Sequence, residues 1–258
     1  MANNLEFPST PDDLYFARGV EVDCFRPFMQ GDVFSGVDIP GVEADEGDEG
    51  RLAMIVTHPC SMRRGPRLVP HIHAVRVKRW ANPIPFEEWS SSFFRIMPLP
   101  ALIIGEKGTT YAAVFETMGR IRSDQLRYDA RIACLSNEGI ILLQQRIVHN
   151  LTRVVVPKRQ LFDHVQHILD EAELQEEWTW TLLGELPEKE VLPRLESEIK
   201  RFDIFLGQRP EGGSSLRDDL KNPERRALVR RTVRAEIRRR KTETENGETL
   251  VEDEGASH

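Results

Sequence analysis

The hydrophobic pattern of this chain changes its period once, close to Lys158. Before that point the apolar residues form short alternating or continuous runs bounded by Gly, Pro and Asp, as in β-strands. After it they recur at intervals of three and four residues, as along one face of a helix. These helical positions are Leu161, Phe162, Val165, Ile168 and Leu169. Strands gathered first and helices appended later predict an α+β fold, with a small β-barrel core followed by C-terminal helices.

Three runs define the predicted core most clearly. Residues 31–39 alternate between the two faces of a strand. Residues 52–57 are almost continuously apolar between turn residues, which favours a central strand buried on both faces. Residues 71–78 alternate with period two, so that His71 and His73 share a face. Further strand candidates are residues 101–104, 111–115, 130–135, 140–146 and 151–156.

Turn and breaker residues set the remaining boundaries. Asn137-Glu138-Gly139 lies between two strand candidates and predicts a hairpin turn. Residues 81–100 hold four prolines and several aromatic residues, which predicts a packed insertion without regular structure. The chain then divides into a loosely ordered lead-in (1–25), a β-barrel-like core with its helix (26–175), a helical extension (176–212), and a basic helix with an acidic disordered tail (213–258).

Composition narrows the class of protein. No apolar run approaches the roughly 18 residues of a membrane span, and the N-terminus lacks the basic start and apolar stretch of a signal peptide. Cys24, Cys60 and Cys134 are an odd and scattered set, which indicates reduced thiols. We therefore expect a cytoplasmic protein without a membrane partner.

Charge is segregated along the chain, although the net charge is only −7. Residues 43–49 form an acidic loop, residues 170–198 are acidic, residues 217–241 are densely basic, and residues 243–254 are acidic again. The apolar stripe of the basic helix is thin, and consists of Val229, Val233 and Ile237. This helix suits contact with a nucleic-acid backbone through Arg226, Arg230 and Arg234. It equally suits docking on the acidic segment or on a protein partner, and a solvated tail is the third interpretation.

The opening of the core resembles the MazF/PemK-like family of bacterial toxins, which are SH3-like barrels that cut RNA. The likeness covers about residues 26–80 and rests on Gln30-Gly31-Asp32-Val33-Phe34, on Gly50-Arg51 before an apolar strand, and on a last strand that leads into a helix. Leu52 stands where the family prefers proline, and the strand 71–78 lacks the Ser or Thr that the family places at its end. The resemblance implies an SH3-like barrel, RNA cleavage in a toxin-like or defence role, and a homodimer.

Arg51 is the sharpest catalytic candidate. A ribonuclease that uses the 2′-hydroxyl as its nucleophile needs a cation to stabilise the negative charge that builds on the phosphorane. A guanidinium suits this role because it is always positively charged. The alternative is an exposed loop arginine that pairs with the adjacent acidic run.

The stretch 57–61 ends the predicted central strand and carries several reactive side chains. His58 suits general acid–base catalysis, and Thr57 and Ser61 are candidate hydroxyl donors. Cys60 would be a nucleophile only if its thiol pKa were lowered. In the alternative interpretation His58 caps backbone groups, the proline sets the turn and Cys60 packs inward.

Two further hypotheses concern ligands. His58, Cys60, His71 and His73 raise the possibility of a metal site, although no established metal-binding signature supports it, and we predict no cofactor. Arg63, Arg64, Arg76 and Lys78, together with the arginines of residues 120–131, predict a basic face for phosphates. We therefore expect a protein that engages nucleic acid, RNA rather than DNA, as an endoribonuclease. The alternative is a non-catalytic module that binds protein or nucleic acid.

Overall fold

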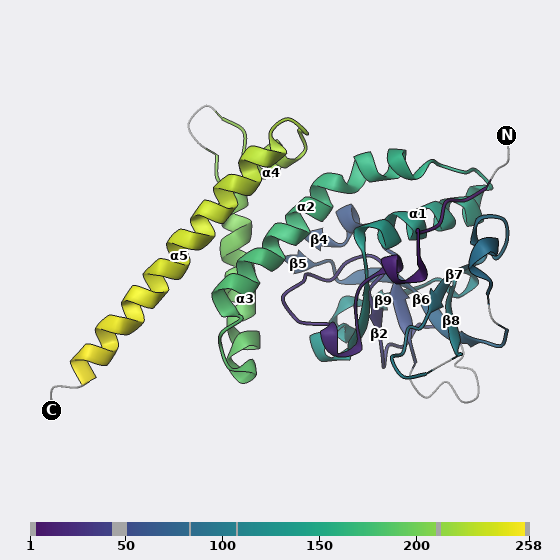
Figure 1. The fold of residues 1–258 in the computed structure, drawn as a ribbon, viewed down its shortest axis with the longest axis horizontal. Helices are drawn as coiled ribbons and strands as arrows, with labels where there is room; N and C mark the ends of the chain where they lie inside the picture. The colour runs from purple at the N-terminus through teal and green to yellow at the C-terminus, as the bar shows by residue number, and fades with distance from the viewer. Residues whose placement is uncertain (1–3, 43–50, 83, 107, 210–212, 256–258) are drawn as a thin grey trace. The chain divides into compact units, whose positions relative to one another are not determined.

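The computed structural model describes residues 4–42, 51–82, 84–106, 108–209 and 213–255, with side chains as far as Glu243. The predicted acidic loop 43–49 lies outside these ranges. The chain forms two compact units. The strand unit consists of Met1–Cys24 and Phe28–Gln166, and the helical unit of Phe25–Pro27 and His167–His258 (Figure 1). The predicted α+β class, with an antiparallel sheet and C-terminal helices, is confirmed.

The strand unit is built on an eight-stranded antiparallel sheet in the order β1-β10-β2-β3-β6-β8-β7, with β9 paired to β6. The bounds are β1 Tyr15–Arg18, β2 Val33–Phe34, β3 Ala53–Ile55, β6 His71–Trp80, β7 Ile96–Pro100, β8 Thr110–Val114, β9 Gly119–Arg122 and β10 Arg131–Leu135. A separate hairpin pairs β4, Arg63–Arg64, with β5, Arg67–Leu68. Within the described strands no pairing joins the end strands β1 and β7.

The centre of the sheet agrees with the sequence. β3 lies between β2 and β6, and its three residues are all buried, as the continuous apolar run predicts. β6 is long enough to pair with β3 on one side and with β8 and β9 on the other. The buried cluster beneath these strands includes Phe34, Ile55, Ile72, Ala74 and Ile121.

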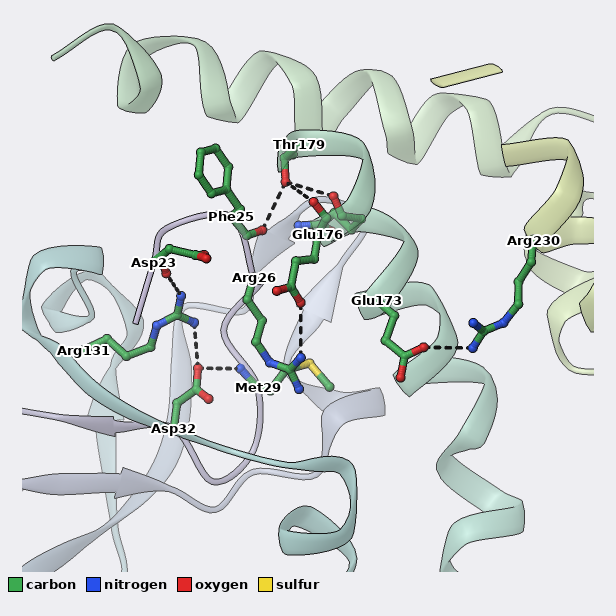
Figure 2. Close-up of polar contacts among 11 residues, drawn as sticks. Asp23, Phe25, Arg26, Met29, Asp32, Arg131, Glu173, Glu176, Thr179 and Arg230 are labelled. Carbon is green, nitrogen blue, oxygen red and sulfur yellow. Dashed lines mark hydrogen bonds and ion pairs between the residues drawn. The ribbon is translucent and has the colours of Figure 1, made fainter. Parts of the chain in front are cut away.

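Gly31 and Asp32, which carry the family likeness, have structural roles. Gly31 has a φ of 90°, and a Cβ there would lie 2.5 Å from the side chain of Leu135. Oδ2 of Asp32 accepts hydrogen bonds from the backbone N–H of Met29 and from Nη1 of Arg131, each at 3.0 Å (Figure 2). The Gly-Asp pair therefore fixes the entry into β2 and ties it to β10.

The predicted hairpin turn at 137–139 and the predicted strands at 140–146 and 151–156 are wrong. Residues 137–152 form helix α1, Asn137–Thr152, and residues 153–156 have no regular secondary structure. The Ser136 hydroxyl accepts a hydrogen bond from the N–H of Gly139, which caps the helix. The run from Ile140 to Leu143 is fully buried, and a buried apolar run does not distinguish a helix from a strand. Gly139 is required for packing, because a Cβ there would lie 2.3 Å from the carbonyl oxygen of Leu14.

The insertion at 81–100 is more regular than its prolines suggest. It ends in β7, which pairs with β8 alone and so occupies an edge of the sheet. Pro98 and Pro100 are tolerated there because an edge strand leaves one row of N–H groups unpaired. The strand predicted at 101–104 is absent, since these residues form turns.

The helical unit contains most of α2, Lys158–Leu183, together with α3, Glu188–Gly207, α4, Leu216–Leu220, and α5, Arg226–Gly255 (Figure 1). Its buried cluster joins Trp178 of α2 and Phe202 of α3 to the predicted stripe of α5, so that stripe is confirmed as a packing face. The predicted disordered tail at 243–254 instead continues α5 to Gly255. None of the helices in the described ranges is both long and apolar enough to cross a bilayer.

Residues 25–27 join the helical unit from the N-terminal part of the chain. The carbonyl oxygen of Phe25 accepts a hydrogen bond from the Thr179 hydroxyl at 3.2 Å, and its ring packs edge-on against Trp180. Nη1 of Arg26 pairs with a carboxylate oxygen of Glu176 at 3.2 Å (Figure 2). This tripeptide is therefore anchored to α2 by both polar and aromatic contacts.

Candidate nucleic-acid interface

The structure separates the two residues on which the predicted ribonuclease site depended. Arg51 precedes β3 and His58 follows it, and the extended run from Leu52 to Val56 that lies between them spans roughly 13 Å at 3.3 Å per residue. Nη1 of Arg51 pairs with Asp38 at 2.8 Å, and both side chains are more than half exposed. Arg51 is therefore an exposed loop arginine, as in the alternative interpretation, although its described partner lies outside the acidic run.

Thr57 and His58 lie instead beside the first residues of β6. The N–H of Val56 donates to the carbonyl of His73 at 2.9 Å, which continues the β3–β6 pairing beyond β3. The Thr57 hydroxyl oxygen accepts a hydrogen bond from the backbone N–H of His73 at 2.6 Å. Thr57 is thus a structural anchor that brings the turn 57–61 to the end of the sheet where β6 begins.

The turn itself gathers an imidazole, a thiol and a hydroxyl. Pro59–Ser61 form a single 3-10 turn, and Nδ1 of His58 accepts a hydrogen bond from the N–H of Cys60 at 3.3 Å. Sγ of Cys60 lies 2.8 Å from the same nitrogen and 3.5 Å from Oγ of Ser61. His58 caps the turn, as the alternative interpretation held, but Cys60 is exposed and does not pack inward. Burial, and then the charge of His164, lower the pKa of His58.

The register of β6 and β9 assembles a second polar surface beside this turn. His71 lies opposite Arg122, and His73 lies opposite Arg120. Directly opposed residues of antiparallel strands share a face, and so do alternate residues of one strand. All four side chains are exposed on one face, whereas Ile72 and Ile121 are buried on the other. We call His71, His73, Arg120 and Arg122 the His/Arg face.

The cations of the His/Arg face differ in their neighbours. Arg122 pairs with Asp124, which lowers the pKa of that carboxyl by hydrogen bonding. Arg120 has no ion-pair partner among the side chains that the structure describes. The sequence places both arginines in a generally basic stretch, but only the strand register shows which histidines they accompany.

The hairpin β4–β5 follows the turn and holds two of the predicted phosphate contacts. Arg64 is exposed, while Nη2 of Arg63 donates to the carbonyl of Phe28 at 2.9 Å and helps to hold the hairpin. The N–H of Val69 donates to the carbonyl of Met62 at 2.8 Å and closes the base of the hairpin. Arg64 is therefore the better placed of the two to meet a ligand.

The prediction that Arg76 contacts phosphates does not hold for the folded chain. Its side chain is fully buried in the strand unit, and Nη1 donates to the carbonyl of Val37 at 3.1 Å. Arg76 shares its face of β6 with Ile72 and Ala74, which are buried, and Val75 and Val77 on the opposite face are buried as well. Lys78, further along the strand, is half-buried opposite Ala112 of β8.

The predicted nucleic-acid contacts of α5 are directed at the acidic residues of α2. Arg230 pairs with Asp170 at 2.7 Å. It also pairs with Glu173 at 2.9 Å, as Figure 2 shows. Arg226 lies 3.7 Å from Asp170, and Arg234 pairs with Glu177 at 2.9 Å. Docking on the protein's own acidic segment is therefore the use of this helix that the geometry shows.

The described part of the chain holds no metal cluster at the His/Arg face, and two of its cavities lie elsewhere. Within the described ranges, no three His, Cys, Asp or Glu side chains are close enough to hold one ion. One cavity, of about 480 Å³, lies in the strand unit beside Glu138, Lys158 and Phe162. Another, of about 680 Å³, lies in the helical unit beside Arg194 and Arg201. Neither is lined by the residues of the turn or of the His/Arg face.

Comparison with known proteins identifies no relative. No family model, no curated protein and no solved structure matches the chain. The likeness to the MazF/PemK-like family therefore remains a prediction from the sequence.

Proposed function

We propose that the strand unit binds RNA through the His/Arg face and the adjoining turn 57–61, and that its imidazoles cleave the bound strand. The register of β6 and β9 carries this proposal, because it places two histidines and two arginines on one exposed face. Guanidinium groups hold phosphates, and histidine transfers protons near neutral pH. A cytoplasmic location, where RNA is at hand and thiols stay reduced, is part of the proposal.

The chemistry needs little beyond these groups, because RNA carries its own nucleophile. A neutral imidazole takes the proton of the 2′-hydroxyl, and the resulting oxygen attacks the adjacent phosphorus. The bond from phosphorus to the 5′-oxygen breaks, and that oxygen receives a proton from an imidazolium. The products are a 2′,3′-cyclic phosphate and a free 5′-hydroxyl. Arg120 lies opposite His73, and in this scheme its guanidinium stabilises the charge on the phosphorane.

Burial favours His58 as the proton acceptor in this scheme. Its lowered pKa keeps the ring neutral at neutral pH, as a general base requires. His73 is exposed, and its backbone is held by Thr57. The backbone pairing joins His73, near the start of β6, to Thr57, the residue that precedes His58.

The test uses the full chain and a long single-stranded RNA without stable structure. The affected variants are Arg120→Ala and His73→Gln, and the matched control is Arg51→Ala, since Arg51 is also exposed but lies beyond the other end of β3. We expect Arg120→Ala to weaken binding and to reduce the salt slope of log K by about 0.7 per lost phosphate contact. We expect His73→Gln to lower cleavage about a hundredfold or more.

The outcomes separate the two halves of the proposal. Binding that responds to Arg120→Ala without any cleavage leaves the non-catalytic binding module as the function. Affinity that is unchanged in Arg120→Ala, or equally reduced in Arg51→Ala, rules out the His/Arg face. Cleavage that disappears in Arg51→Ala and persists in His73→Gln returns the catalytic role to Arg51.

A further inference from the structure

The contact between Cys60 and His58 indicates a chemical role for the thiol that is separate from RNA binding. Cys60 is exposed, and its Sγ lies 2.8 Å from Nδ1 of His58. The backbone N–H of Cys60 donates to the same nitrogen at 3.3 Å. A ring nitrogen that accepts a hydrogen bond carries no proton, so the neutral ring has its proton on Nε2 and a lone pair beside the sulfur. A base in contact with an exposed thiol is the arrangement of an activated nucleophile.

The two other cysteines provide contrasts within the same chain. Cys134 lies on β10 and is buried, with 1% of its surface exposed. Cys24 is half-buried. Cys60 is the exposed cysteine, and its Sγ contacts the imidazole of His58. A reagent whose rate depends on thiolate formation and on access to the sulfur should therefore react fastest with Cys60.

The surroundings of Cys60 indicate the charge of its reaction partner. The chain passes from the turn directly into the basic hairpin β4–β5, where Arg64 is exposed. The positively charged His/Arg face adjoins the other side of the turn through the pairing of Val56 with His73. Cations on both sides of the turn attract an anionic reagent.

We propose that Cys60 is a reactive thiol that exchanges with small anionic disulfides to form a mixed disulfide. The thiol proton passes to Nδ1 of His58, and the Cys60 thiolate attacks one sulfur of the incoming disulfide. The bond between the two sulfurs of that disulfide breaks as the new bond to Cys60 forms. The leaving thiolate takes the proton back from the imidazolium and departs as a free thiol. The incoming disulfide is the oxidant, so the exchange needs no other reagent.

This exchange does not depend on the proposed RNA binding, and its test uses no RNA. The full-length protein is incubated with oxidised glutathione, which is anionic, and in parallel with cystamine, which is cationic. Peptide mapping by mass spectrometry then gives the rate of adduct formation at each cysteine. We expect the Cys60 adduct to form at least about tenfold faster than either other adduct, and faster with glutathione disulfide than with cystamine.

Variants test the role of the imidazole. His58→Gln keeps a polar side chain but removes the base, and we expect it to slow the Cys60 adduct about tenfold or more. His167→Gln, in the helical unit, is the matched control and should leave the rate unchanged. Circular dichroism of both variants verifies that they fold. The proposal is overturned if Cys60 reacts no faster than Cys24, if cystamine reacts as fast as glutathione disulfide, or if His58→Gln leaves the rate unchanged.

Discussion

Nη1 of Arg131 lies 3.0 Å from Oδ2 of Asp32, and the two side chains are 0% and 1% exposed. The pair joins β10 to the entry of β2, two segments that are adjacent in the sheet and far apart in the sequence. The ring faces of Phe28 and Tyr128 lie near the guanidinium, with ring centroids at 5.1 and 5.7 Å from Cζ. Asp32 thus has a structural role at the position where the sequence resembles a nuclease family.

Replacing one partner of this pair should be costly, because it leaves a buried charge poorly compensated. We expect Asp32→Asn to lower the free energy of unfolding by about 3–5 kcal/mol, measured by urea denaturation. Asp38→Asn, which affects the exposed pair with Arg51, is the matched control and should change little. Equal effects of the two variants would show that the buried pair does not hold these strands together.

Arg146 of α1 organises the insertion at 81–100 in a comparable way. Its guanidinium is buried and donates hydrogen bonds to the carbonyl oxygens of Trp89, Phe93 and Ile96 at 2.7–2.8 Å. Burial lowers the pKa of Arg146 to about 10. One planar side chain thereby satisfies several carbonyl groups of an irregular segment, as a forked donor set permits.

We expect Arg146→Lys to destabilise the protein by about 3 kcal/mol or more, because an ammonium cannot reach all of these carbonyl groups in their fixed directions. The insertion should also become sensitive to limited proteolysis, with cuts that mass spectrometry maps to residues 81–95. Arg95→Lys is the control, since Arg95 lies in the same segment but is exposed. An Arg146→Lys protein with normal stability and no new cuts would contradict this role.

The sequence predicts strongly patterned elements well, and the reasons are physical. The central position of β3 and the apolar stripe of α5 follow from burial, which requires apolar side chains at the spacing of the element. Helix α1 is missed because residues 140–143 are apolar on all sides of the helix, and because Gly139 is a residue type typical of turns although packing requires it here.

The candidate site is predictable only in part. Thr57, His58 and Ser61 are found from their place at a strand end. The partnership of His73 with Arg120 depends on the register between β6 and β9, which brings together two residues more than forty positions apart in the sequence and which composition does not encode. The burial of Arg76 is missed for a related reason, since alternation defines two faces but does not say which one is covered.

His149 gives the stability of the strand unit a defined pH dependence. The side chain is buried near the end of α1, and its ring centroid lies 4.4 Å from that of Phe94. Burial, and then the charges of Arg153 and Arg146, lower the pKa of His149. Below about pH 6.5 the imidazole of His149 is therefore protonated in the unfolded chain, whereas in the folded chain its protonation requires a lower pH. The free energy of unfolding should fall as the pH drops below that value, because the unfolded state binds more protons.

The measurement is urea denaturation at about pH 7.5 and about pH 5.5, on either side of the unfolded histidine pKa. The wild type should be less stable at the lower pH, and His149→Gln should reduce the difference. His58 contributes in the same direction, because its pKa is also lowered. A wild type that is equally stable at both values, or more stable in acid, would contradict this assignment.

Arg230 and Arg231 are neighbours on α5 with opposite environments. Replacing each of them distinguishes docking of the basic helix on α2 from contact of this helix with nucleic acid. Arg230 pairs with the buried Asp170, whereas Arg231 is exposed. Deleting the whole helix would be uninformative, because it would also uncover the apolar cluster around Trp178. We expect Arg230→Ala to lower the free energy of unfolding by about 1–3 kcal/mol and Arg231→Ala to leave it nearly unchanged.

RNA affinity of Arg231→Ala, and of Arg238→Ala as a second exposed variant, completes the comparison. If the basic helix serves to dock on α2, neither Arg231→Ala nor Arg238→Ala should weaken RNA binding at fixed salt, since both side chains are exposed and directed away from the packing face. A loss of affinity in these two variants, with stability intact, would instead show that the outer side of α5 contacts the phosphate backbone. That result would restore the role that the charge pattern first suggested for this helix.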